Sequence, residues 1–158
     1  MYQHITVPLD GSELAECVLP HLSAIAGGCK VSKVTLARVV EPVYIPGELE
    51  PDLPRKEQQQ LLERVKAATM KDARSYLDRV AKQLKHDGIK VRSEVLYGDA
   101  ADEIADYVKK KGVDLVIIST HGRSGASHWV WGSVASRILR SVCAPVFMVR
   151  APGCFPGI

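Results

Sequence analysis

One stretch of the chain has residue types and spacing that suit phosphate binding: STHGRSGASHWVWGS, from Ser119 to Ser133. A phosphate needs backbone N–H groups that converge on it, and Gly122 and Gly125 let the backbone turn sharply and approach a ligand closely. Gly132 and the serine after it open a predicted helix, whose first amides and positive dipole end would face the same ligand. We therefore interpret the stretch as a candidate phosphate cradle.

Two charged side chains extend this hypothesis. Arg123 could add a charge-assisted contact to the phosphates, and the alternative is an ordinary solvated arginine. Asp10, in PLDG near the start of the chain, could accept hydrogen bonds from ribose hydroxyls. Its alternative role is to cap the first helix, and the local sequence favours neither role over the other.

Other chemistries fit the stretch less well. A hydrolase elbow needs GxSxG, whereas Ser124 stands in GRSG, and no acidic residue is evidently set to support His121 or His128. GRSG also has the form of the RNA-clamping loop of KH domains, but the predicted strand order and a missing basic or aromatic platform oppose that fold. No GxxxxGK[ST] occurs, which excludes a Walker-type kinase or ATPase.

The elements that must position these residues alternate between strands and helices. Pro20 falls inside the first predicted helix and should kink it, and Gly27-Gly28 should end that helix. Periodicity predicts strands over 3–9, 33–40, 90–96, 113–118 and 145–150, and helices over 12–28, 58–85, 99–112 and 132–141.

This alternation predicts an α/β fold: a single-domain, doubly wound, five-stranded parallel sheet with helices on both faces. Residues 90–96 alternate cleanly and suit an edge strand, whereas the apolar run 113–118 suits the middle of the sheet. The order 3-2-1-4-5 satisfies both, and its topology reverses between strands one and four. We expect a ligand crevice at the carboxyl ends of those two strands, where Asp10 and Ser119 lie.

Composition limits the remaining possibilities. We expect the 158 residues to form one domain over 1–158, with a proline-rich loop at 41–57 and a tail at 151–158. The net charge of +3 comes from scattered Lys and Arg, so we predict neither a nucleic-acid nor a membrane partner. The four cysteines form no CxxC and suit a reducing compartment, and no apolar run resembles a signal peptide. These features together predict a cytoplasmic protein.

Several motifs together make the chain similar to one family. That family's nucleotide motif is a glycine, two residues, a second glycine, nine residues and then Gly-Ser or Gly-Thr. Here Gly122 is the second glycine, Gly132-Ser133 ends the motif, and Ser119 takes the place of the first glycine. Further segments match: VPLDGS, LARVVEP, GDAADEIADYVKKKGVDLVIISTHGRSG and CAPVFMVR. The chain thus resembles the universal stress protein family over all but the proline-rich loop and the last residues.

The resemblance implies that the ligand is ATP or another adenine nucleotide, with Mg²⁺ as a candidate companion ion. Backbone around Val39 would hold the adenine, Asp10 the ribose, and Gly122, Gly132 and Ser133 the phosphates. The full set of nucleotide-binding residues that we predict is Pro8, Asp10, Val39, Ser119, Gly122, Arg123, Gly125, Gly132, Ser133 and Val134. Related proteins also pair their last strand across a two-fold axis, so we expect a homodimer through Pro145 to Arg150.

Two functions remain open. Fast ATP hydrolysis needs metal ligands and compensation for phosphate charge, and the predicted crevice offers only Asp10 and Arg123, without a second acid. We therefore expect a nucleotide-binding sensor or switch in stress response, with slow hydrolysis at most. The alternative is a nucleotide-free dimeric interaction module of the same family. Ser119 favours that alternative, whereas Gly122 and Gly132-Ser133 favour nucleotide binding.

Overall fold

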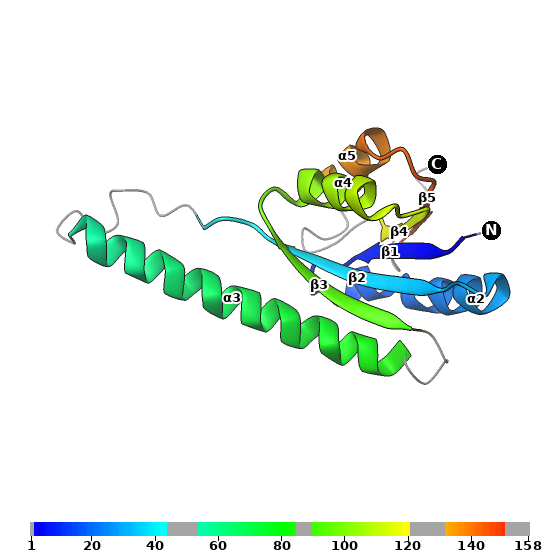
Figure 1. Cartoon of the computed structure of the whole chain (residues 1–158), viewed down its shortest axis with the longest axis horizontal. Coiled ribbons are helices and arrows are strands. Elements are labelled where there is room, and N and C mark those ends of the chain that lie inside the picture. Colours follow the sequence, from blue (N-terminus) through cyan, green and yellow to red (C-terminus); the bar gives the residue numbers. More distant parts are fainter. Residues whose placement is uncertain (1, 44–53, 85–89, 121–131, 151–158) are drawn as a thin grey trace, which may run out of the picture.

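The computed structural model describes residues 2–43, 54–84, 90–120 and 132–150, and within them a parallel sheet with the order β3-β2-β1-β4-β5 (Figure 1). This confirms the predicted fold class and strand order. The strands are β1 His4–Pro8, β2 Lys33–Val40, β3 Val91–Tyr97, β4 Leu115–Ser119 and β5 Val146–Val149. The helices are α1 Glu13–Glu16, α2 Leu19–Cys29, α3 Arg55–Leu84, α4 Ala100–Lys111 and α5 Ser133–Ser141.

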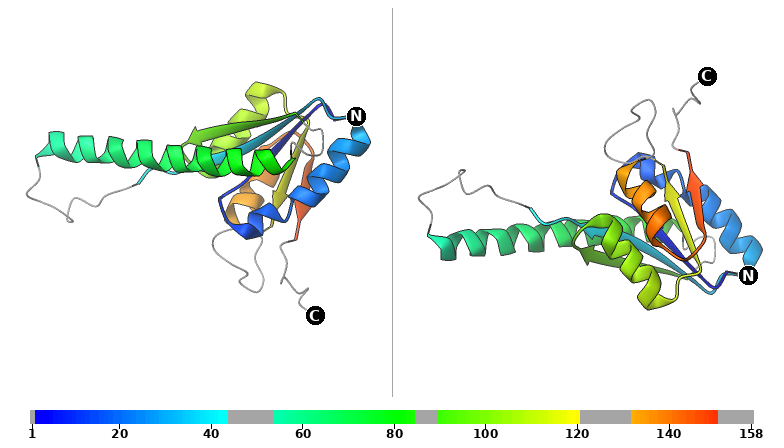
Figure 2. Two further views of the ribbon diagram at one scale, coloured as in Figure 1. Left: turned by 90° about the horizontal axis from the view of Figure 1, so that it is seen from below. Right: turned by 90° about the horizontal axis from the view of Figure 1, so that it is seen from above.

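Helices cover both faces of the sheet, as predicted: α1, α2 and α3 lie on one face, and α4 and α5 on the other (Figures 1 and 2). Strand side chains alternate between two apolar cores. Leu36 packs with Leu77 under the first three helices, whereas Ala37 packs with Ile104 and Ile138 on the opposite face. β4 is buried along its whole length, because it lies between β1 and β5 with helices on both sides.

The segment after β1 differs from its prediction. In place of one kinked helix it forms two helices, and Pro20 lies in the first turn of α2. Proline is tolerated there because the first amides of a helix have no intrahelical acceptor. Gly27 and Gly28 do not end the helix, which continues to Cys29 and stops at Lys30 in the left-handed conformation, with φ of 50°.

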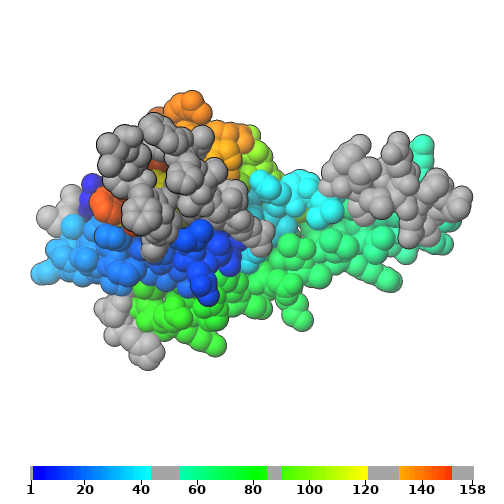
Figure 3. Space-filling view, turned by 180° about the vertical axis from the view of Figure 1, so that it is seen from behind, coloured from blue at the N-terminus to red at the C-terminus, as the bar shows by residue number. Residues whose placement is uncertain are grey.

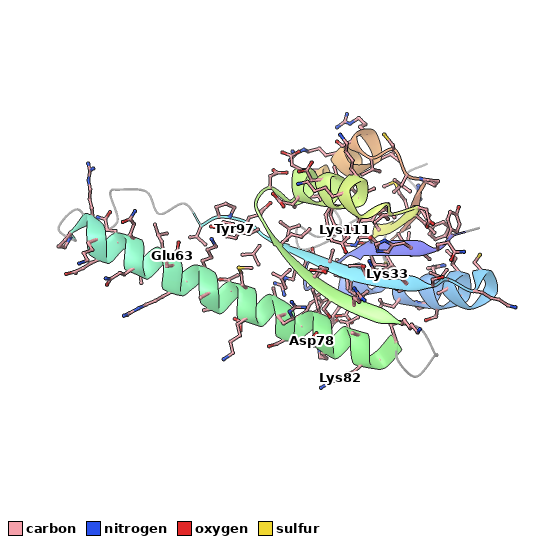
Figure 4. The ribbon with its side chains drawn as sticks, in the orientation of Figure 1. Lys33, Glu63, Asp78, Lys82, Tyr97 and Lys111 are labelled. Atoms are coloured by element: carbon pink, nitrogen blue, oxygen red, sulfur yellow. The ribbon has the colours of Figure 1, made fainter. Side chains whose placement is uncertain are left out.

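The longest helix, α3, begins at Arg55 rather than at the predicted 58. Its C-terminal half packs on β2 and β3 through an apolar stripe that includes Leu77 and Val80. Its N-terminal half, which carries Glu63, extends beyond the sheet (Figures 3 and 4). Within the described part of the chain, no helix combines the length and the apolar character needed to cross a membrane.

The boundaries of α4 agree with the predicted helix over 99–112. The side chain of Asp99 accepts hydrogen bonds from the amides of Ala101 and Asp102, at 3.0 and 3.1 Å. Gly112 ends the helix with φ of 60°, a conformation that glycine adopts without steric cost. β3 is an edge strand, as predicted, and of its seven residues only Arg92 is exposed. α3 packs against the face of this strand that carries Val91 and Val95, and Arg92 lies on the opposite face.

A buried polar cluster lies at the opposite end of the sheet from the carboxyl ends of the strands. The imidazole of His4 is only 7% exposed, and its Nε2 lies 2.9 Å from the hydroxyl oxygen of Thr35. Tyr107 donates to the same Thr35 oxygen at 3.3 Å, and His4 Nδ1 lies 3.4 Å from the carbonyl oxygen of Lys111. Burial lowers the pKa of His4, and the positive charge of Lys33 lowers it further. In its neutral form, His4 donates from Nδ1 to the Lys111 carbonyl and accepts from the Thr35 hydroxyl at Nε2.

Candidate functional site

A cavity of about 470 Å³ opens at the carboxyl ends of β1, β2 and β4. This is the end of the sheet where the connections diverge in opposite directions, and open α/β sheets bind ligands at that point. Of the residues predicted from the sequence, those that line the cavity are Pro8, Asp10, Val39, Ser119, Gly132, Ser133 and Val134. The predicted residues Gly122, Arg123 and Gly125 lie outside the described residues.

Two backbone hydrogen bonds fix the mouth of this cavity. The amide of Leu9 donates to the carbonyl of Ala37 at 2.8 Å, which continues the pairing of β1 with β2 past the end of β1. The amide of Gly132 donates to the carbonyl of Thr120, also at 2.8 Å. The second bond joins the residues that flank 121–131. The two flanks of this segment therefore lie next to each other beside the cavity.

The N-terminus of α5, like that of α2, has no side-chain cap. Gly132 occupies the cap position and forms no side-chain hydrogen bond, and the first turn of α5 contains no acidic residue. In contrast, α1 and α4 are capped by Ser12 and Asp99 and carry acidic residues in their first turns. Because Ser133 and Val134 line the cavity, the positive end of this helix faces it without an intramolecular counter-charge from its own first turn.

Asp10 is not the cap of the first helix. Ser12 takes that role, because its hydroxyl oxygen accepts the amide of Ala15 at 3.1 Å. Asp10 in turn accepts hydrogen bonds from the backbone amide and the hydroxyl of Ser12, at 2.9 and 2.7 Å. This Asx turn fixes the Asp10 carboxylate at the cavity wall.

Ser119 is the last residue of β4 and is only 7% exposed. Its Cα pairs with that of Val149, and the next amide, that of Thr120, donates to the carbonyl of Val149 at 2.8 Å. The position that the motif gives to a glycine is therefore occupied here by a strand residue with ordinary β geometry.

Two charged residues of the cavity wall were missed by the sequence analysis. Arg38 and Glu41 lie at and just beyond the carboxyl end of β2, and both line the cavity. The prediction that the crevice holds no second acid is therefore wrong. The signal that could have identified them is their place: β2 neighbours β1, and the carboxyl ends of neighbouring parallel strands meet at one edge of the sheet.

The long helix also contributes to the cavity. Thr69 of α3 and Val43, which follows β2, line the cavity together with Val39. Beside this region Tyr97 ends β3 (Figure 4). The Lys66 ammonium of α3 lies 4.1 Å from the centroid of the Tyr97 ring. The extended half of α3 thus begins where the wall of the cavity ends. Among the described residues, no group of three or more His, Cys, Asp or Glu side chains could hold a metal ion.

The fold and this site can be compared with known proteins. The family model described as Universal stress protein family matches residues 1–150. The chain belongs to the universal stress protein family. Universal stress protein MJ0531 of Methanocaldococcus jannaschii is 29% identical to it over 96% of this chain and 84% of the relative. Universal stress protein MJ0577 of the same organism is 26% identical over 95% of this chain and 96% of the relative.

Solved structures agree with this assignment. The structure of MJ0577 superposes on this universal stress protein with a TM-score of 0.82 and 27% identity, covering 97% of this chain and 99% of that one. A universal stress protein in complex with cAMP has a TM-score of 0.63 at 18% identity, covering 95% and 98% of the two chains. An Arabidopsis thaliana family member with AMP bound has a TM-score of 0.59 at 15% identity, covering 96% and 93%. At these lower identities the likeness shows a shared fold.

Proposed function

We propose that this universal stress protein binds ATP or another adenine nucleotide in the cavity and acts as a cytoplasmic sensor or switch in stress response. The observation that carries the proposal is the uncapped N-terminus of α5, which faces a cavity that Asp10 also lines. A helix N-terminus attracts a phosphate, and a carboxylate accepts hydrogen bonds from ribose hydroxyls. The relatives bound to cAMP and AMP support an adenine nucleotide as the ligand class.

In the bound state we expect the adenine to lie against the backbone of Val39 and against Pro8, with the ribose at Asp10. The phosphates would reach the first amides of α5 at Gly132 and Ser133. In the predicted set, Ser119 and Val134 flank these groups, and Gly122, Arg123 and Gly125 would add contacts from residues 121–131. A Mg²⁺ ion would arrive with the phosphates of ATP, since this ion keeps several waters and needs few protein ligands.

The cavity wall favours binding over rapid hydrolysis. Fast phosphoryl transfer needs an oriented water and positive groups that offset the charge on the transferred phosphate. The described lining holds no lysine, and its acids Asp10 and Glu41 lie at the ends of neighbouring strands. We expect hydrolysis to be slow at most.

Isothermal titration calorimetry with ATP, ADP, AMP and cAMP tests the proposal. We expect saturable binding of at least one of the four, near one nucleotide per chain. Absence of heat and of any thermal stabilisation with all four, at millimolar ligand, would contradict it. Bound ligand must stabilise the folded state by mass action, so the two readouts check each other.

The alternative, a nucleotide-free dimeric interaction module, is favoured by one observation. Phe147 is 40% exposed on β5, the edge strand where we expect two copies to pair into a homodimer. The same calorimetry separates the two functions. A stable dimer that binds none of the four nucleotides would support the alternative.

A further inference from the structure

Two arginines contact one tyrosine ring beside the cavity. The guanidinium carbons of Arg38 and Arg79 each lie 5.2 Å from the ring centroid of Tyr76. The two arginines differ in their other surroundings. Arg38 comes from β2 and lines the cavity, whereas Arg79 comes from α3 and pairs with Glu16 of α1 at 3.0 Å. The two residues therefore form a natural pair of variant and control.

Arg38 also contacts the turn that carries Asp10. Gly11 has φ of +92°, and a Cβ placed on it would lie 3.0 Å from Cζ and Nη1 of Arg38 and 3.1 Å from Nη2. Because these three distances are nearly equal, the flat face of the guanidinium covers Gly11. Glycine suits this position because of its positive φ, and a Cβ here would require the guanidinium to shift by a few tenths of an ångström. Arg38 thus lies between Tyr76 of α3 and Gly11 of the turn that carries Asp10, and it contacts both.

The turn itself has little freedom. Ser12 holds the Asp10 carboxylate from the side of α1, through the bonds at 2.9 and 2.7 Å. Arg38 closes on the turn from the side of β2 and α3. Burial raises the pKa of the Tyr76 phenol, and the negative charges of Glu16 and then Asp10 raise it further, so Asp10 is electrostatically close to this group of residues.

We propose that Arg38 is a positioning residue, which holds the turn from Asp10 to Ser12 so that the Asp10 carboxylate meets the ribose hydroxyls of the nucleotide. This inference rests on the proposed function. It makes a specific claim: Arg38 acts on the nucleotide through Asp10. Loss of Arg38 should remove the contribution of the ribose hydroxyls to affinity and leave the adenine and phosphate contacts in place.

The test is the affinity ratio between ATP and 2′,3′-dideoxy-ATP, which lacks the ribose hydroxyls. It is measured by calorimetry for the wild type, Arg38→Met and Arg79→Met. We expect the wild type to prefer ATP by about tenfold or more, which corresponds to about 1.4 kcal/mol. Arg38→Met should bring ATP down to the affinity of the dideoxy analogue, whose own affinity changes by less than about threefold. Arg79→Met removes an equal contact to Tyr76 and should keep the wild-type ratio.

Two further variants guard against a purely structural effect. Arg38→Lys keeps the charge but lacks the flat face that covers Gly11, so the preference should again fall, with thermal unfolding as the check on folding. In an Asp10→Ala background, Arg38→Met should leave the ratio unchanged, because the group through which Arg38 acts is already gone. A general loss of packing would not depend on Asp10 in this way.

The outcomes separate the two proposals. If the wild type prefers ATP and Arg38→Met keeps that preference, the role of Arg38 is overturned while nucleotide binding stands. If Arg38→Met weakens both ligands equally, Arg38 acts on the whole site, and the positioning role is again overturned. If the wild type binds neither ligand, the proposed function fails and the inference fails with it.

Discussion

The amide of Gly132 donates a hydrogen bond to the carbonyl of Thr120 at 2.8 Å, across a gap of eleven residues in the sequence (121–131). Both flanking residues line the cavity, so the two ends of the intervening segment are attached at the cavity wall. This hydrogen bond links the sequence motif to the cavity. In the sequence, Ser119 and Gly122 of the motif stand at the start of the segment, and Gly132-Ser133 follow its end.

The first prediction uses the two tryptophans of the chain, Trp129 and Trp131, which lie within this segment and outside the described residues. We expect saturating ATP to change their fluorescence emission, because the segment begins and ends at the cavity wall. Their alternative role is to pack against the domain or a partner subunit, and a nearby ligand would still alter their surroundings. If calorimetry detects ATP binding while emission stays constant, the phosphates bind elsewhere.

The second prediction concerns Ser119→Gly. We expect the free energy of unfolding to fall by roughly 0.5–1 kcal/mol, because glycine within a strand loses more conformational entropy on folding. ATP affinity should rise or stay the same, since the backbone can then approach the ligand without a Cβ. Chemical denaturation and calorimetry measure the two effects. A loss of about tenfold in ATP affinity in both Ser119→Gly and Ser119→Ala would make the serine hydroxyl a ligand in its own right.

The third prediction is a pH dependence from His4. Its pKa is lower in the folded state than the ordinary 6.5, so the unfolded chain binds the proton more readily. The contribution of His4 to the free energy of unfolding should therefore be fully present above about pH 6.5 and should decline as the pH falls below that value. Lys33 and Arg92 oppose protonation of this ring, whereas Asp114 and the Lys111 carbonyl favour it.

Denaturant titrations between about pH 5 and 8 measure the effect. The decline should be smaller in His4→Gln than in the wild type. Equal pH slopes in the two proteins would show that the ring of His4 titrates normally in the folded state.

The fourth prediction concerns the proposed homodimer. Phe147→Glu places a charge on the exposed face of the edge strand β5 and should yield a monomer at micromolar concentration by light scattering. Leu139→Glu is the matched control, because Leu139 is equally exposed, at 41%, but lies on α5. A wild type that is already monomeric would rule the interface out.

Local patterns were sufficient to predict the sheet. Apolar runs and alternation are properties of a few consecutive residues, and the rules of parallel connection leave few strand orders. Pro20 was misread because a proline kinks a helix when it lies in the middle but is favoured in the first turn. Only the position of the helix start shows which situation applies. Gly27 and Gly28 were misread because packing of the neighbouring Ala26 in the core carries the helix through them.

The site was predicted only in part. Asp10 and Ser119 were identified because topology alone places the ends of β1 and β4 at the crevice, and Gly132 was identified because it opens the predicted helix after β4. Strand order could have placed Arg38 at the crevice, but its contacts with Gly11 and Tyr76 join residues that are distant in the chain. No local pattern encodes a contact of that kind.

The fifth prediction tests the central claim, that the N-terminus of α5 receives the phosphates. Ser133→Asp adds a negative charge at the first position of that helix, where it should raise the free energy of unfolding by about 0.3–1 kcal/mol. The same charge should repel phosphates, so stability and binding should change in opposite directions. Ser133→Asn is the control of equal size without the charge.

The decisive measurement is therefore ATP titrated calorimetrically into the wild type, Ser133→Asn and Ser133→Asp. We predict that the ATP affinity of Ser133→Asn stays within about threefold of the wild type, while Ser133→Asp weakens ATP binding by about tenfold or more despite its higher stability. Equal ATP affinity in Ser133→Asp and Ser133→Asn would show that the N-terminus of α5 does not receive the phosphates.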